Sequence, residues 1–283
     1  MDGLFTGQAT GWAMDDPADP TVLGDLAAAA ARAGGTVALD AFRTDLEVRT
    51  KTDAMDAVTA ADLAAQERVI ETIRDTDPDA AIVAEEADAA SEIPASGRAW
   101  IIDPIDGTNN YAVGGRLWAT CVACVEDETP VAAVTHLPAM DDTYRTVSGA
   151  TRRNGEPVAV RDRSDPRAAV VAPVFGLAMA DRPAYSATST AIVSTFGDLR
   201  QLGSGQTALA MVAAGELDGV VTTLRHSPWD TVAGAHLVRK AGGRVTDANG
   251  ADWRADSHGL VASNGRIHDA LLEVAQHGLD AEE

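Results

Sequence analysis

The segment Trp100–Tyr111, WIIDPIDGTNNY, places two carboxylates at the end of a strand that belongs in a core. The apolar run Trp100–Ile102 is typical of a buried strand. Asp103 and Asp106 interrupt this run, Pro104 prevents a simple continuation of the ladder, and turn-forming and helix-starting residues follow. The fold must therefore bring the end of a buried strand to a polar site.

Asp103 and Asp106 are like charges three residues apart on a tight, partly buried turn. Such a pair repels unless a cation lies between the two carboxylates, and hard oxygen ligands suit Mg²⁺ or Mn²⁺ rather than zinc. If Glu85 and Asp230 approach the same point, the oxygens suffice for two or three divalent ions, a device for hydrolysing phosphate esters. Backbone N–H groups at Gly107 and the next residue would then face a phosphate.

Simpler structural explanations exist for the other acidic residues next to apolar segments. Asp62 suits a helix N-cap, Glu86 a solvated surface, and Asp230 the first turn of a helix, where a negative charge is favourable. None of these three residues would indicate a site by itself.

The apolar periodicity changes along the 283 residues, 46% of which are hydrophobic. The first half predicts a helix over 21–43, loosened at Gly34–Gly35, a helix over 62–74, and strands over 80–84, 117–126, 130–137 and 143–147. From about residue 165, strands and helices alternate, which is the pattern of an α/β half. We expect two closely packed lobes, residues 1–145 and 146–283, in an α+β or α/β layered fold.

The composition excludes several classes of function. The net charge of −21 repels nucleic-acid phosphates, so we expect no nucleic-acid partner. No run of 18 apolar residues and no signal peptide is apparent, which predicts a soluble cytoplasmic protein without membrane contact. The acidic excess indicates a salt-rich cytoplasm, as in a halophilic archaeon. Cys121 and Cys124 allow a redox or zinc interpretation, but with no second pair and no nearby His they are better explained as buried small hydrophobes.

Two motifs carry a resemblance to a known family. The segment Trp100–Tyr111 together with Trp229–Gly243, WDTVAGAHLVRKAGG, resembles the two signature motifs of the inositol monophosphatase family, the magnesium-dependent, lithium-sensitive sugar phosphatases. Further matches at VTAAD (58–62), VAEEA (83–87), GATRRNGEPVAV (149–160) and ASNGRIHDALL (262–272) extend it over essentially the whole chain. The resemblance implies an α-β-α-β-α sandwich with the metals between the lobes, and a homodimer.

The resemblance also implies a role for each matching position. The first Mg²⁺, which activates the water, would be held by Glu85, Asp103 and the main-chain carbonyl of Ile105, with Glu85 thereby part of the catalytic set. Asp103 would bridge to a second metal held by Asp106 and Asp230. Thr108, paired with Asp62, would orient and deprotonate the water, and the N–H groups of Gly107 and Thr108 would bind the phosphate. Glu86 would support the site or a third metal, and Lys51 would match a basic residue of a mobile loop.

The chain departs from the family pattern at the substrate pocket. Inositol-specific members carry a glutamate seven residues before the aspartate of the second motif, where this chain has Thr223. Arg225 and His226 would face a second phosphate, as fructose 1,6-bisphosphate requires, or Arg225 simply extends to solvent. Gly205, within GSGQT (203–207), would line the pocket or merely begin a helix.

The expected function is hydrolysis of small phosphorylated substrates, inositol 1-phosphate and fructose 1,6-bisphosphate, by a metal-activated water. Two alternatives stay open: a 3′-phosphoadenosine 5′-phosphate phosphatase, and a non-catalytic relative that only binds divalent cations. The presence of both Asp62 and Thr108 favours catalysis, because metal binding alone would need only the other carboxylates.

Overall fold

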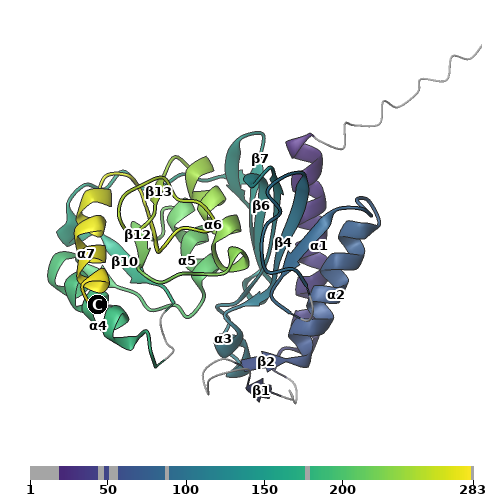
Figure 1. Cartoon of the computed structure of the whole chain (residues 1–283), viewed down its shortest axis with the longest axis horizontal. Helices are drawn as coiled ribbons and strands as arrows, with labels where there is room; N and C mark the ends of the chain where they lie inside the picture. Colours follow the sequence, from purple (N-terminus) through teal and green to yellow (C-terminus); the bar gives the residue numbers. More distant parts are fainter. Residues whose placement is uncertain (1–18, 44–47, 51–56, 87–88, 176–178, 282–283) are drawn as a thin grey trace, which may run out of the picture.

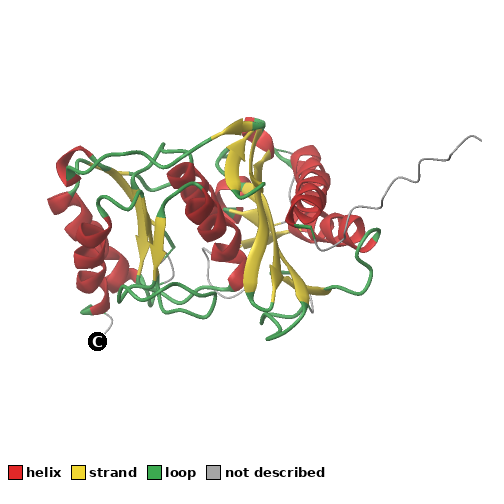
Figure 2. Cartoon of the chain, turned by 90° about the horizontal axis from the view of Figure 1, so that it is seen from above, coloured by secondary structure: helices red, strands yellow, loops and turns green. Residues whose placement is uncertain are grey.

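The computed structural model describes residues 19–43, 48–50, 57–86, 89–175 and 179–281. Its elements stack as five layers, with two helices, a seven-stranded sheet, two further helices, a five-stranded sheet and a last pair of helices (Figure 1). The layers are seen in succession from above (Figure 2). The expected α-β-α-β-α sandwich is therefore confirmed.

The first sheet has the strand order β3-β4-β5-β6-β7-β8-β9, and only β3 and β4 are parallel. Its strands are β3 (Ala81–Ala84), β4 (Arg98–Asp106), β5 (Ala119–Glu126), β6 (Thr129–Leu137), β7 (Asp142–Val147), β8 (Ala150–Arg153) and β9 (Glu156–Pro157). The outer helices α1 (Pro20–Ala41) and α2 (Ala60–Arg74) bury their apolar faces against β4, β5 and β6. A hairpin of β1 (Val48–Thr50) and β2 (Ala57–Thr59) precedes α2, and α3 (Thr108–Ala112) follows β4.

Helix α1 is continuous, so the expected loosening at Gly34–Gly35 is wrong. Both glycines face neighbours at very close range. A Cβ on Gly34 would lie 2.4 Å from Cγ2 of Val69 in α2, and one on Gly35 would lie 2.7 Å from Cδ2 of His136 in β6. The gain from this close packing outweighs the low helix propensity of glycine. By length and composition α1 would also pass as a membrane span, but it is half buried among α2 and the sheet, as core helices are.

The second sheet has the order β11-β10-β12-β14-β13, with β10 parallel to both of its neighbours. Its strands are β10 (Val170–Pro173), β11 (Asp198–Leu199), β12 (Gly219–Thr222), β13 (Arg244–Thr246) and β14 (Leu260–Ser263). Helices α4 (Arg182–Thr195) and α7 (His268–Leu279) cover its outer face. The predicted alternation of strands and helices after residue 165 is thus observed.

Helices α5 (Gly205–Ala213) and α6 (Pro228–Lys240) form the middle layer and share one apolar core with both sheets. The expected change of lobe at residue 145 falls inside β7, and the first sheet continues to Pro157. The division of the chain into two lobes stays a prediction. Cys121 and Cys124 are free and buried within β5, in agreement with their interpretation as small hydrophobes.

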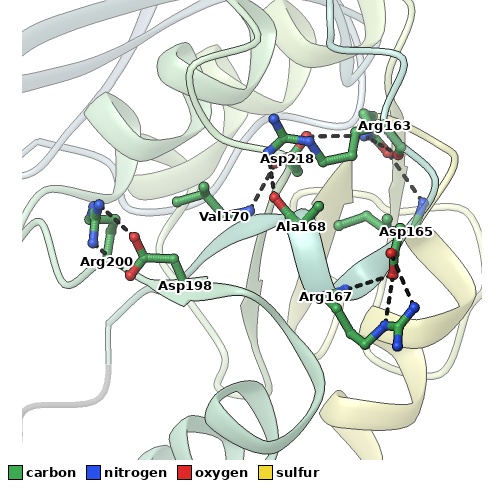
Figure 3. A network of polar contacts seen from close by, with 10 residues as sticks. Arg163, Asp165, Arg167, Ala168, Val170, Asp198, Arg200 and Asp218 are labelled. Carbon is green, nitrogen blue, oxygen red and sulfur yellow. Dashed lines mark hydrogen bonds and ion pairs between the residues drawn. The ribbon is translucent and has the colours of Figure 1, made fainter.

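The fully buried carboxylate of Asp218 links the segment between the two sheets, which carries Arg163, to β10 of the second sheet (Figure 3). Asp218 accepts from Nη1 of Arg163 at 2.9 Å and from the backbone N–H of Val170 at 2.8 Å. The same Arg163 nitrogen donates to the carbonyl of Ala168 at 2.6 Å. Because a buried charge is tolerated only when it is paired and hydrogen-bonded, this network has a structural role.

Candidate active site

The two carboxylates of the first motif lie at the end of β4, at the point where its ladder becomes irregular. Asp103 pairs with Cys121 of β5 and Asp106 with Ala119, and the register shifts between these two pairs. The hydroxyl of Thr120 donates to the carbonyl of Pro104 at 2.8 Å, which satisfies the kinked backbone. The irregularity lets both carboxylates leave the strand while its apolar residues stay in the core.

Asp103 lies at the centre of a group of acidic side chains. It is 2% exposed, and burial is the largest cause that raises its pKa well above the ordinary value. The charges of Glu85, Asp106, Asp230 and Asp62 raise it further, in that order. The structure therefore brings together, around one buried carboxyl group, the acidic residues selected from four separate parts of the sequence.

Helix α2 supplies Asp62 and also fixes the segment that carries Glu85 and Glu86. Asp62 is fully buried in the first turn of α2. One turn later, Gln66 donates from Nε2 to the carbonyl of Glu86 at 2.6 Å and accepts from the backbone N–H of Glu86 at 2.8 Å. Residues four apart share a helix face, so Gln66 sets the position of this segment relative to Asp62. Gln66 is not among the residues predicted from the sequence, where its only signal is this spacing from Asp62.

Asp106 reaches across to the middle layer and accepts hydrogen bonds at the start of α5. Its Oδ2 accepts from the backbone N–H of Gln206 at 2.9 Å and from the hydroxyl of Ser204, and its Oδ1 accepts from the N–H of Gly205 at 3.2 Å. Burial raises the pKa of Asp106 to about 6, although these hydrogen bonds lower it. Gly205 is therefore the first residue of a helix, which was one of the two roles expected for it. Its N–H donates directly to Asp106, a predicted metal ligand.

Asp230 occupies the third position of α6, where its Oδ2 accepts from the backbone N–H of Ser227 at 3.0 Å in a capping box. Gln206 joins this helix to α5, since its Nε2 donates to the carbonyl of Trp229 at 2.5 Å and its Oε1 accepts from the N–H of Gly234 at 2.7 Å. The relative position of Asp106 and Asp230 is therefore set by the contact between α5 and α6.

The turn after β4 carries the remaining residues of the first motif. The hydroxyl of Thr108 donates to the carbonyl of Ile105 at 3.1 Å, which is the carbonyl assigned to the first metal. Gly107 has φ +91°, and a Cβ there would lie 3.0 Å from Cβ of Ser204, so the backbone conformation and the close neighbour both favour glycine. Asn110 donates to the carbonyls of Leu117 at 2.6 Å and Leu202 at 2.7 Å, which ties this turn to the segment before α5.

Three aromatic side chains pack together at α3. The ring centroids of Tyr111 and Trp118 are 5.0 Å apart in an edge-to-face arrangement, and Phe42 lies within 5.4 Å of both. The hydroxyl of Tyr111 donates to the carbonyl of Ala38 in α1 at 2.7 Å. These contacts hold the helix that begins at Thr108 in place through Tyr111.

Thr223 and Arg225, two of the predicted substrate residues, have different surroundings. Thr223 is buried on the face of the second sheet that α4 and α7 cover, where a Cβ on Gly278 would be 2.7 Å from its methyl group. Arg225 is exposed and donates from Nη1 to the carbonyl of Asp256 at 3.2 Å. Lys51 lies outside the described residues. Their proposed contacts with substrate stay predictions.

The acidic group fits a divalent cation by its chemistry. The charges of four other carboxylates raise the pKa of Asp103, and its Oδ1 is buried with no hydrogen-bond partner among the described residues. Within the same part of the chain, no three Asp, Glu, His or Cys side chains converge closely enough to coordinate one ion as they stand. Asp106 and Asp230 instead accept from backbone N–H groups at two helix starts. The charge crowding favours a cation.

Known proteins resemble the chain over nearly its full length. The profile of the inositol monophosphatase family matches residues 19–279. A fructose-1,6-bisphosphatase/inositol-1-monophosphatase of Thermotoga maritima is 34% identical over 80% of this chain and 85% of that protein. A Pasteurella multocida protein named Nus factor SuhB is 33% identical over 91% of this chain and 97% of its own length. A solved Thermotoga maritima IMPase superposes with a TM-score of 0.83 at 32% identity, covering 92% of this chain and 98% of that one.

The layered fold and the buried acidic group, taken with these matches, define a metal-dependent phosphoric monoester hydrolase that acts on small phosphorylated substrates. The chain belongs to the inositol monophosphatase family.

Proposed function

We propose that this protein hydrolyses small sugar and polyol phosphates, including inositol 1-phosphate and fructose 1,6-bisphosphate, with Mg²⁺ as its metal and Mn²⁺ as a substitute. The observation that carries the proposal is the crowding of Glu85, Asp106, Asp230 and Asp62 around the buried Asp103. So much negative charge in one desolvated place favours divalent cations and a phosphate brought in with them. The relatives whose names contain both activities support the two substrates.

The proposed roles are those that the resemblance to the family implies for these positions. Glu85, Asp103, Asp106, Asp230 and the carbonyl of Ile105 would hold two ions, and Glu86 would support them or a third. Divalent ions there would lower the pKa of water and offset the charge of the phosphate. Asp62 and Thr108 would orient the attacking water and take its proton. The N–H groups of Gly107 and Thr108 would hold the phosphate oxygens.

We further propose that the protein is a homodimer in the cytoplasm of a halophilic organism, on the grounds of its family and its net charge of −21. Sedimentation at several protein concentrations would test the dimer. A monomer at every concentration would contradict it.

A substrate panel with the purified protein tests the proposed function. Inositol 1-phosphate, fructose 1,6-bisphosphate and 3′-phosphoadenosine 5′-phosphate would be assayed with Mg²⁺, with Mn²⁺ and after chelation. We expect hydrolysis of the first two, abolished by chelation and restored by added Mg²⁺. Exclusive hydrolysis of the nucleotide would support the alternative phosphatase. Binding of Mg²⁺ without hydrolysis of any ester would support the non-catalytic alternative.

A further inference from the structure

Two aromatic side chains are in contact beside the candidate active site, and the roles proposed so far do not include this contact. The ring centroids of Phe175 and His226 are 4.0 Å apart with an interplanar angle of 35°. Phe175 comes two residues after β10 and His226 four residues after β12, and these strands are parallel neighbours. Both rings therefore lie where the carboxyl ends of parallel strands meet, which is the usual position of ligands in open α/β sheets.

The contact between Phe175 and His226 completes a series of contacts that connects two predicted metal ligands, Asp106 and Asp230. Asp106 accepts from the N–H of Gly205, and Gly205 lies directly against Phe175, since a Cβ on Gly205 would be 2.1 Å from Cζ of the ring. His226 precedes Ser227, whose N–H donates to Asp230. Asp106 and Asp230 are thus connected, on the side of the second sheet, through Gly205, Phe175, His226 and Ser227.

The backbone of Phe175 adopts a conformation that bulky residues avoid. Its φ is +64°, in the left-handed region, where a Phe is a genuine outlier and the backbone is strained. Strained residues of this kind cluster at ligand sites. His226 presents an uncharged ring, because burial lowers its pKa to about 4, and its Nε2 lies 3.1 Å from the hydroxyl of Thr222.

We propose that Phe175, backed by His226, is a specificity-determining residue whose ring packs against the C–H face of a ring-shaped leaving alcohol. This inference rests on the proposed function and specifies its substrate class. Cyclic polyol and sugar phosphates would bury an apolar face on the aromatic ring, and open-chain phosphates would gain little from it. Phe175 touches neither the carboxylates nor the phosphate in this scheme, so it selects the alcohol and leaves the chemistry unchanged.

The test compares ring and open-chain esters in matched variants. Steady-state kcat/KM would be measured for inositol 1-phosphate, cyclohexyl phosphate and glycerol 2-phosphate in the wild type, Phe175→Ala and Phe175→Tyr. Phe196→Leu is the control, because it removes a ring from the core beneath α4 and α7, on the other face of the sheet. Calorimetric titration with cyclohexylphosphonate and methylphosphonate, which resist hydrolysis, gives a readout independent of turnover.

We expect Phe175→Ala to lower kcat/KM for the two ring esters and the affinity for cyclohexylphosphonate by roughly five- to tenfold, as burial of one ring face implies. Values for glycerol 2-phosphate and methylphosphonate should change less than about twofold, and Phe175→Tyr and Phe196→Leu should keep the wild-type preference. Equal losses for ring and open-chain compounds, or no loss for either, would overturn the inference. A wild type that neither hydrolyses nor binds any of these compounds would instead remove the proposed function, and this inference with it.

Discussion

Asp106, at the end of β4, accepts a hydrogen bond of 2.9 Å from the backbone N–H of Gln206 in the first turn of α5. A carboxylate on the first sheet thereby binds the positive end of a helix that packs between the two sheets. The same Gln206 holds α6 through the carbonyl of Trp229. Gln206 therefore couples Asp106 of the first motif to the helix that carries Asp230.

Replacing Asp103 by Asn tests the proposed metal centre. Asp103 is a buried carboxyl group whose pKa four other carboxylates raise, and an amide would bridge two cations less well than a carboxylate. We expect Asp103→Asn to abolish Mg²⁺-dependent hydrolysis and to weaken Mg²⁺ binding in calorimetric titration. Asp218→Asn serves as a control, because it changes a buried carboxylate of the structural network in Figure 3. Full activity of Asp103→Asn would exclude the bridging role.

Asp62→Asn separates activation of water from metal binding. Asp62 lies in the first turn of α2, on the helix face that positions Glu86 through Gln66. Loss of a positioned general base lowers kcat by about 10² to 10⁴, and we expect Mg²⁺ affinity to stay close to that of the wild type. Calorimetry and kcat measured on the same preparation check both statements. A large loss of Mg²⁺ affinity would make Asp62 a ligand instead.

Gly34→Val tests the close approach of α1 to α2. A Cβ at this position meets Val69 at 2.4 Å and the carbonyl oxygen of Ala65 at 2.9 Å, so the two helices must separate. Overpacking of this kind costs about 1–3 kcal/mol in the free energy of unfolding. Ala29→Val is the control, because it introduces the same side chain into α1 at an exposed position. Similar urea midpoints for the two variants would contradict the packing argument.

Thermal stability should rise from dilute buffer to molar KCl with Mg²⁺ held constant. The net charge of −21 makes the folded chain repel itself, and salt screens this repulsion because the Debye length falls to roughly 3 Å at 1 M. Calorimetric or fluorescence melting over a series of KCl concentrations measures the effect. Saturating Mg²⁺ throughout keeps constant the stabilisation that arises from ligand binding. A flat melting temperature would remove the argument for adaptation to salt.

Arg225→Ala distinguishes the two interpretations of this residue. Arg225 is exposed, and Nη1 donates to the carbonyl of Asp256, which leaves other guanidinium nitrogens for a second phosphate. A hydrogen bond to a charged group contributes roughly 1.5–3 kcal/mol, so we expect a selective loss of about ten- to a hundredfold in kcat/KM for fructose 1,6-bisphosphate. Inositol 1-phosphate is the internal control. Unchanged or equally reduced values would leave Arg225 as a solvent-facing side chain.

The sequence alone determined the elements and the acidic residues that matter. Strand periodicity identified β3 to β7, and helical periodicity identified α1, α2 and α4 to α7, because these signals are local. The acidic residues stood out because each follows or interrupts an apolar segment, and two motifs about 120 residues apart indicated the family. Local patterns also gave the wrong expectation at Gly34–Gly35, where propensity argued for a weak helix.

Only the tertiary structure decided which of these residues meet and which do not. The contact of Asp106 with the start of α5, the hydrogen bonds of Gln66 with Glu86, and the contact of Phe175 with His226 join residues from separate elements. Thr223 and Arg225 are two residues apart, yet one is buried beneath α7 and the other is exposed beside Asp256. Periodicity reports the environment of one element, whereas these contacts depend on how separate layers pack, and that is set by the shape and burial of the whole core.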